Sequence, residues 1–191
     1  MRTILKWCMA TRIYLWVVRD ILSWIRISCN HTRLTGQKYR EGYKLLKPGQ
    51  IILSTDESRI SSFLTPGDLD HAALCVGKGT TYEVGEMTHL GYTKSTFFDI
   101  CHTSDRVVLL ECYDWDKEYV KKVIKKCKSL VGTLYDFQFQ SGNMTLYCSE
   151  LPAICDVENR LGIPIYREAY YILPRDYYNH PRIRVIWDSD K

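Results

Sequence analysis

Two residues far apart in the sequence, Cys148 and His71, have the side chains that nucleophilic catalysis requires. A thiolate attacks carbonyl carbons, and an imidazole is a common base for removing the proton of the thiol. Cys148 lies where a polar stretch changes to an apolar one, and residues 146–155 predict a helix that opens near it. The first N–H groups of a helix can hold an oxyanion, and its positive dipole end favours the thiolate. The position of Cys148 therefore favours a nucleophile.

His71 begins a short apolar strand, residues 71–76, after a polar loop, so we expect its ring at the rim of a sheet. A turn at residues 77–79 and a second strand over residues 80–85 complete a β-hairpin. Glu83 lies on the second strand, where its carboxylate can accept a hydrogen bond from the other ring nitrogen and fix the tautomer. The three residues predict a Cys-His-Glu triad, although each of them taken alone is more often structural.

Other elements of the chain predict a small sheet that positions these residues. Short apolar runs read as strands at residues 51–54, 106–112 and 183–187. Residues 116–131 have apolar side chains at helical spacing, with Asp116 as the N-cap and Gly132 just beyond the end. The pattern predicts an α+β domain with a small, largely antiparallel sheet packed against the nucleophile helix.

The first 28 residues carry an apolar stripe at helical spacing, and residues 29–47 read as a polar connector with about one helical turn. A basic amphipathic helix packs on its own domain or a partner, or lies on an anionic membrane surface. Packing is the favoured interpretation, and residues 4–28 are the candidate for peripheral membrane contact. We predict two parts, an N-terminal helix and connector over residues 1–45 and a catalytic domain over residues 46–191.

Composition narrows the classes of function. The chain has 191 residues, enough for one domain with a core, and a net charge of +4 that is spread along it. The lysines near residue 125 have the spacing of a solvated helix face, so we expect no nucleic-acid partner. Its eight cysteines include no C-x-x-C pair and no zinc-ligand spacing. Scattered free thiols predict a reducing, cytoplasmic compartment, and the chemistry calls for no metal or organic cofactor.

A series of short motifs also follows in a fixed order along the chain: Lys47-Pro48-Gly49-Gln50-Ile51, Asp70-His71-Ala72-Ala73-Leu74, Thr81-Tyr82-Glu83-Val84, Gly132-Thr133-Leu134-Tyr135-Asp136-Phe137, Tyr147-Cys148-Ser149-Glu150-Leu151 and Ile172-Leu173-Pro174-Arg175-Asp176. This series resembles the permuted papain-like amidases. They form the circularly permuted branch of the NlpC superfamily, which is related to the lecithin retinol acyltransferases. The resemblance covers residues 45–187.

The resemblance implies a circularly permuted papain-like fold and a role for each matching residue. By position, Cys148 is the nucleophile, His71 the general base and Glu83 the residue that orients His71. Permutation also accounts for a histidine that precedes the cysteine, the reverse of the usual papain-like order. Glu86 competes for the third role, but Glu83 fits the strand motif better. Tyr135 is expected to anchor packing rather than to take part in the chemistry.

The predicted function is a cysteine hydrolase that cleaves an amide, ester or thioester through an acyl-enzyme. Members of the family act on peptides, other amides and acyl lipids, so the implied substrate is a peptide, an amide or an acyl lipid. The alternative is an inactive interaction module, or a membrane-associated one, with the same fold. The joint presence of Cys148, His71 and Glu83 favours the enzyme.

Overall fold

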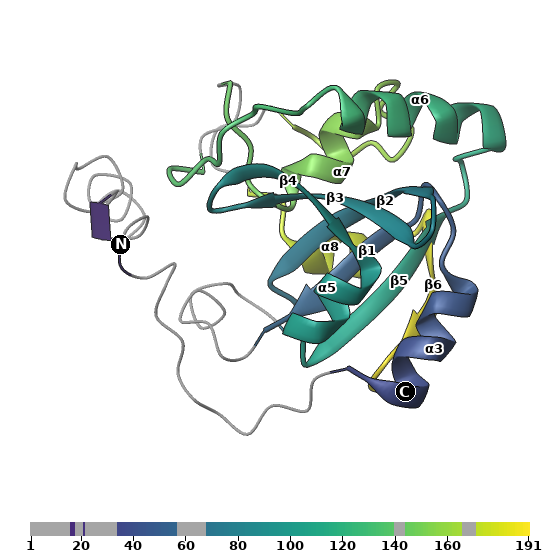
Figure 1. Ribbon diagram of the computed structural model, residues 1–191. Coiled ribbons are helices and arrows are strands. Elements are labelled where there is room, and N and C mark those ends of the chain that lie inside the picture. The colour runs from purple at the N-terminus through teal and green to yellow at the C-terminus, as the bar shows by residue number, and fades with distance from the viewer. Residues whose placement is uncertain (1–15, 18–20, 22–33, 57–67, 140–143, 166–170) are drawn as a thin grey trace.

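The computed structural model describes residues 34–56, 68–139, 144–165 and 171–191, together with residues 16, 17 and 21. Its centre is one antiparallel sheet in the strand order β4-β3-β2-β1-β5-β6 (Figure 1). The strands are β1 (Ile51–Thr55), β2 (His71–Lys78), β3 (Tyr82–Thr88), β4 (Gly91–Thr96), β5 (Arg106–Cys112) and β6 (Ile183–Asp188). An antiparallel sheet with a few helices confirms the predicted α+β class.

The central strands are apolar on both faces because helices cover both faces. Successive side chains of a strand point to opposite sides of its sheet. Ile51 of β1 and Leu110 of β5 therefore lie in one buried cluster, while Ile52 and Leu109 lie in the other. A strand buried on both faces reads as an uninterrupted apolar run, which is the pattern of these strands in the sequence.

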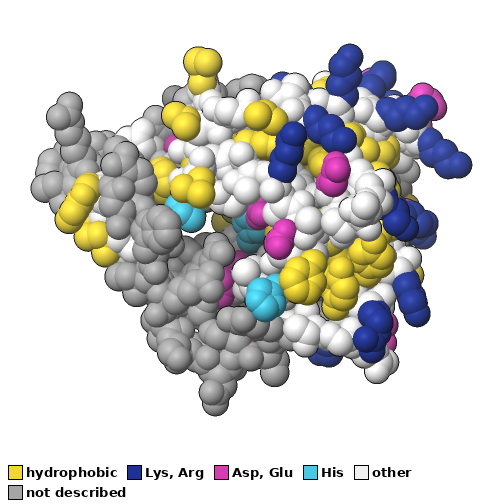
Figure 2. All heavy atoms as spheres, in the orientation of Figure 1, with side chains coloured by type: hydrophobic (Ala, Val, Ile, Leu, Met, Phe, Trp, Pro, Cys, Tyr) yellow, Lys and Arg dark blue, Asp and Glu magenta, His cyan; other side chains and the backbone are white. Residues whose placement is uncertain are grey.

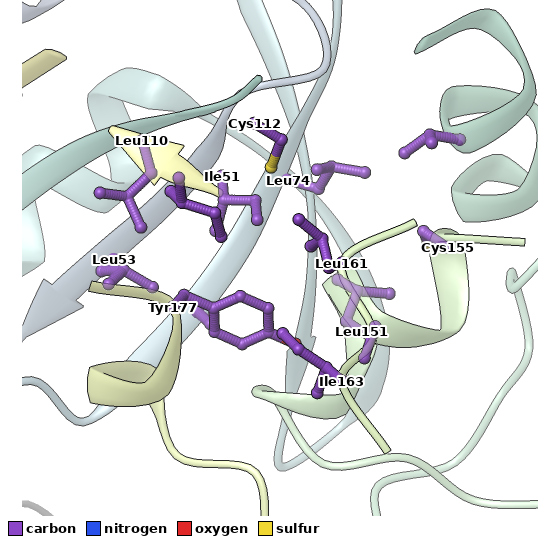
Figure 3. Packing of buried hydrophobic residues seen from close by; sticks show 14 of the residues in the cluster. Ile51, Leu53, Leu74, Leu110, Cys112, Leu151, Cys155, Leu161, Ile163 and Tyr177 are labelled. Carbon is purple, nitrogen blue, oxygen red and sulfur yellow. The ribbon is translucent and has the colours of Figure 1, made fainter. Parts of the chain in front are cut away.

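The larger cluster lies under α6 (Lys117–Lys128), α7 (Glu150–Cys155) and α8 (Pro174–Tyr178). Figure 3 shows the ring of Tyr177 from α8 between Leu53 of the sheet and Ile163, with Leu151 of α7 close by. Leu151 and Tyr177 have no exposed surface. Replacing Leu151 by alanine would cost about 2–5 kcal/mol of stability, so this packing holds the start of α7 against the sheet.

The opposite face is covered by α3 (Gly36–Leu45) and α5 (Phe97–Thr103) (Figure 1). The prediction of a polar connector over residues 29–47 is wrong for its second half, because residues 36–45 form a ten-residue helix. A Cβ atom at Gly42 would lie 3.0 Å from the Trp187 ring and 3.1 Å from the Phe97 ring, so this helix packs very closely. Its packed face consists of tyrosines and a glycine, which gives little aliphatic periodicity in the sequence.

Other boundaries differ from the prediction by a few residues. The N-cap of α6 is confirmed, since the Asp116 carboxylate accepts hydrogen bonds from the Glu118 and Tyr119 N–H groups at 2.9 and 3.0 Å. The helix ends at Lys128 rather than at residue 131. Strand β4 and helix α5 were not predicted, because β4 is a polar strand at the edge of the sheet.

The predicted N-terminal helix and the proposed membrane contact through residues 4–28 lie almost entirely outside the described residues. The division of the chain at residue 46 stays a prediction. Within the part of the chain that the structure describes, no helix has both the length and the apolar composition that a membrane span needs.

Candidate active site

Cys148 lies in a buried turn that leads into α7. The two residues before Cys148, Leu146 and Tyr147, are positioned by a short parallel bridge between Leu146 and Tyr135. The following residue, Ser149, is the N-cap of α7, and its carbonyl oxygen accepts a hydrogen bond from the Tyr177 hydroxyl at 2.6 Å. Only 8% of Cys148 is exposed. The thiol is therefore held by structure on both sides.

The predicted helix over residues 146–155 is shorter than expected. Helix α7 spans Glu150–Cys155, so its six residues begin two positions after Cys148. The dipole of so short a helix is small, and it cannot be the main cause of an activated thiol. Another source of stabilisation for the thiolate is needed, and the neighbouring imidazole supplies it.

His71 is the first residue of β2, as the sequence predicted. Its Nε2 atom lies 2.8 Å from Oε2 of Glu86 on β3. The second oxygen of Glu86, Oε1, accepts a hydrogen bond from the Ser95 hydroxyl at 2.5 Å. Because Glu86 occupies Nε2, the other ring nitrogen, Nδ1, is the one left for the thiol. The Cys148 side chain lies close enough to the ring to raise the pKa of His71.

Glu83 does not contact His71, so the prediction that it orients this histidine is wrong. Its side chain is 56% exposed, and its carboxylate lies 3.8 Å from the Lys128 ammonium. It pairs with Gly77, near the far end of β2. The six residue-to-residue steps from His71 to Gly77 span about 20 Å of strand, so no rotamer of Glu83 reaches the ring.

The hairpin register explains the error. A turn centred on residue 78 would place Glu83 opposite Ala73, two residues from His71. Strand β2 instead continues to Lys78, and the register places Glu86 opposite Ala73. Residues two apart on a strand share a face, so Glu86 can reach His71. Glu86 was the competing candidate, and no feature of the sequence marks where the turn lies.

The electrostatics of the pair favour a thiolate beside an imidazolium. Burial raises the pKa of the Cys148 thiol, but the hydrogen bond and the charge of His71 lower it by more, and the net shift is downward. The Ser149 hydroxyl and the Ala72 N–H lower this pKa further. Burial lowers the pKa of His71, but hydrogen bonds to Cys148 and Glu86 raise it to about 10. Both shifts favour the form of the pair in which a thiolate lies beside an imidazolium.

Tyr135 is a site residue that the sequence did not reveal. Burial raises the pKa of its hydroxyl well above the ordinary value, and the charge and hydrogen bond of Cys148 raise it further. The Cys148 N–H has the opposite, smaller effect and lowers this pKa. The Leu146 N–H donates to the Leu134 carbonyl at 3.1 Å, and the Asp136 N–H donates to the Leu146 carbonyl at 3.0 Å. These bonds hold Tyr135 beside the sulfur, where packing alone was expected.

Comparison with known proteins identifies a family and solved structures of similar fold. The sequence profile of the permuted papain-like amidase enzymes (YaeF/YiiX, C92 family) matches residues 45–187. The crystal structure of metalloprotein yiiX from Escherichia coli O157:H7, DUF1105, is 16% identical with a TM-score of 0.58. The alignment covers 75% of this chain and 97% of that one. No curated protein matches the sequence. The family model confirms the predicted family, and the similarity to the yiiX structure shows that the two chains share a fold.

The yiiX structure is described as that of a metalloprotein, so the donor groups around Cys148 bear on whether this chain could hold a metal ion. In the ranges described here, no three or more His, Cys, Asp and Glu side chains are grouped so that they could hold one. Beside Cys148 there is one imidazole, and its Nε2 is already bonded to Glu86. The described residues around Cys148 therefore do not fit a metal centre.

Proposed function

The chain belongs to the permuted papain-like amidase family (C92), and from this premise we propose that it is a cysteine hydrolase with a Cys148-His71-Glu86 triad. The observation that carries the proposal is the pairing of Cys148 with a histidine whose other nitrogen is bonded to a carboxylate. This is the relation of nucleophile, base and orienting acid that covalent hydrolases share.

The reaction begins with attack of the Cys148 thiolate on the carbonyl carbon of the substrate. The carbonyl oxygen becomes an oxyanion, for which the Cys148 N–H and the Tyr135 hydroxyl are the candidate donors. The His71 imidazolium then gives its proton to the leaving nitrogen, oxygen or sulfur. The bond to the leaving group breaks, and an acyl thioester on Cys148 remains.

Deacylation uses the same groups in the opposite sense. Neutral His71 takes a proton from water, and the hydroxide formed attacks the thioester carbonyl. The second oxyanion collapses, the carboxylic acid leaves and the thiolate returns with a protonated His71. Water enters the overall reaction once, and no oxidant, reductant or cofactor is consumed.

Glu86 has two tasks in this scheme. It holds Nε2 of His71 at 2.8 Å and so directs Nδ1 towards the sulfur. It also stabilises the positive ring in the resting ion pair. Ser95 fixes the other carboxylate oxygen, which leaves Glu86 little freedom to turn away.

An amide is the first candidate for the scissile bond, because the family is one of amidases. Esters and thioesters remain candidates because the same attack opens them more easily. The test is a set of chromogenic compounds that share one acyl group and differ in the leaving atom. We expect hydrolysis and a mass increase equal to the acyl group on Cys148, detected by peptide mass spectrometry.

The matched control is Cys148→Ala, which should accept no acyl group. An absence of any adduct on Cys148 with all three bond types would count against the hydrolase. It would favour the non-catalytic interaction module with the same fold.

A further inference from the structure

Exposed aliphatic side chains gather beside the nucleophile segment. They are Leu90 (72% exposed), Val131 (60%), Leu134 (66%) and Met144 (95%), and we call this group the apolar rim. Single exposed apolar residues are ordinary on soluble proteins, whereas a contiguous group of them marks an interaction site. Whether the rim is contiguous is therefore the first question.

Backbone contacts bring its members together from two separate parts of the chain. The turn before β4 lies against residues 133–134, since the Tyr92 N–H donates to the Thr133 carbonyl at 2.9 Å. A Cβ atom on Gly91, whose φ is +93°, would lie 2.5 Å from the Thr133 oxygen. Only glycine allows so close an approach, which seats Leu90 next to Leu134.

Met144 joins the same group from the other side. The Leu146 N–H donates to the Leu134 carbonyl at 3.1 Å, and Met144 lies two residues before Leu146. Figure 2 shows hydrophobic side chains over this end of the molecule. The backbone contacts thus place Leu90 and Met144 on segments that lie against residues 133–134, and Val131 precedes these by only a few residues.

The rim also borders the proposed active site. Leu134 is exposed, while the next residue, Tyr135, turns inward to the Cys148 thiol. Leu146, which precedes Cys148 by two residues, pairs with Tyr135 in an isolated bridge. Whatever covers the rim therefore lies beside the nucleophile.

Basic side chains flank the rim. Lys125 and Lys126 lie in the last turn of α6, a few residues before Val131. Neither forms an ion pair with any residue that the structure describes. The next lysine, Lys128, forms a long ion pair, with 3.8 Å between its Nζ atom and Oε2 of Glu83. Figure 2 shows Lys and Arg side chains along the region of α6, beyond the hydrophobic ones.

Exposed aliphatic side chains next to lysines favour one kind of binding partner. Aliphatic residues on turns, next to lysines without acidic partners, are typical of surfaces that insert shallowly between anionic headgroups. We propose that the apolar rim and the basic end of α6 form a docking surface for an anionic membrane. The surface is distinct from residues 4–28, and it seats the Cys148 site against the lipid.

A consequence concerns the substrate, and this part rests on the proposed hydrolase. A nucleophile held at the headgroup level meets the acyl carbonyls of lipids rather than peptides in solution. The class of substrate that fits is an amide- or ester-linked acyl lipid.

The test of docking measures binding and needs no enzymatic activity. The full chain is mixed with vesicles of phosphatidylcholine, with or without about one third phosphatidylserine, and sedimented. We expect binding to the anionic vesicles that weakens as salt is raised. The Leu134→Glu/Met144→Glu variant should bind at least about tenfold more weakly, and Lys125→Gln/Lys126→Gln should bind several-fold more weakly.

The control is Phe98→Glu, which places one carboxylate, half the charge of the double variant, on a side chain that is 49% exposed on α5, across the sheet. It should bind like the wild type. Equal binding by Leu134→Glu/Met144→Glu and the wild type would overturn the proposal. So would a lack of binding to anionic vesicles, which would leave a partner protein as the occupant of the rim.

A second measurement needs no variant. Hydrogen exchange of the wild-type chain should slow at residues 88–92 and 131–134 when anionic vesicles are added. Unchanged exchange in both segments would contradict docking. Because neither readout involves turnover, an inactive protein that still docks would refute the hydrolase and leave the membrane surface intact.

Discussion

The buried cysteines of this protein fall into two environments that give the same side chain opposite properties. Cys75 and Cys101 have no exposed surface, and burial raises the pKa of each thiol to about 12. Cys148 is almost as buried, yet its pKa is lowered. The core cysteines face apolar side chains or a backbone carbonyl, whereas Cys148 faces His71. Burial alone raises the pKa of a thiol and makes it unreactive, whereas a neighbouring imidazolium lowers the pKa again.

Cys127 shows that a lowered pKa can have another cause. Its thiol pKa is lowered by a hydrogen bond from Cys155, despite burial, and the Tyr92 hydroxyl lies 3.5 Å away. The pKa of Cys155 is raised in turn by the same bond. Two thiols that share a proton have no base to take it, so this pair lacks the feature that sets Cys148 apart.

The largest expected effect follows from removing the imidazole. His71→Ala should give Cys148 a raised pKa like that of the unreactive core cysteines, and it should lower kcat/KM by about 10³–10⁴-fold. Site-resolved labelling with iodoacetamide at neutral pH measures the reactivity of each cysteine. In the wild type, Cys148 should react much faster than Cys75, Cys101 and Cys112. If His71→Ala left the rate at Cys148 unchanged, the ion pair would not be its cause.

Loss of the tyrosine hydroxyl should have the next largest effect. Tyr135→Phe removes one donor to the oxyanion, so kcat should fall by about a hundredfold. The thiol keeps His71, so the iodoacetamide rate at Cys148 should stay near that of the wild type. Steady-state kinetics and labelling thus separate the two roles. A parallel loss of kcat and labelling would assign Tyr135 to activation of the thiol instead.

The two glutamates of β3 give a matched pair of variants. Glu86→Gln keeps the shape of the orienting group but removes its charge, and kcat/KM should fall by about tenfold to a hundredfold. Glu83→Gln changes an exposed residue far from the ring and should leave kcat/KM unchanged. The opposite result, a loss only in Glu83→Gln, would restore the assignment made from the sequence.

The same pair has a pH signature. Protonated His71 keeps the thiolate paired up to its pKa of about 10, so activity that needs the imidazolium is lost as the pH rises through this value. Glu86 raises that pKa, so the upper limb of the profile should move to lower pH in Glu86→Gln and stay in place in Glu83→Gln.

The smallest effect on activity is expected from changing a core cysteine with a raised pKa. Cys75→Ala deletes a sulfur from the core and should cost about 1–2 kcal/mol of unfolding free energy. Its kcat/KM should equal that of the wild type, because the thiol never ionises in the working range of pH. Urea denaturation and kinetics measure the two quantities. A loss of activity without a loss of stability would mean that the core thiols are reactive.

The sequence predicts the features that depend on local motifs, and it misses those that depend on how separate segments pair. Cys148 and His71 were found because their motifs are local, and the apolar runs of β1, β2 and β5 fixed the centre of the sheet. The orienting acid was missed because hairpin register is not local to either strand. Tyr135 was missed because its direction depends on the bridge to Leu146. Helix α3 was missed because tyrosines replace the aliphatic residues that mark a buried stripe.

The way the proposed triad is divided along the chain also affects the order of folding. His71 and Glu86 are 15 residues apart and meet within one hairpin. Cys148 reaches its place through contacts such as that with the Asp70 carbonyl, 78 residues earlier in the chain. Local contacts form before distant ones, since closing a long loop costs more entropy. On a ribosome, the base and its acid are therefore in place before the thiol has been synthesised. The thiol becomes reactive only once the last third of the domain has folded, so a truncated or half-folded chain carries no active nucleophile.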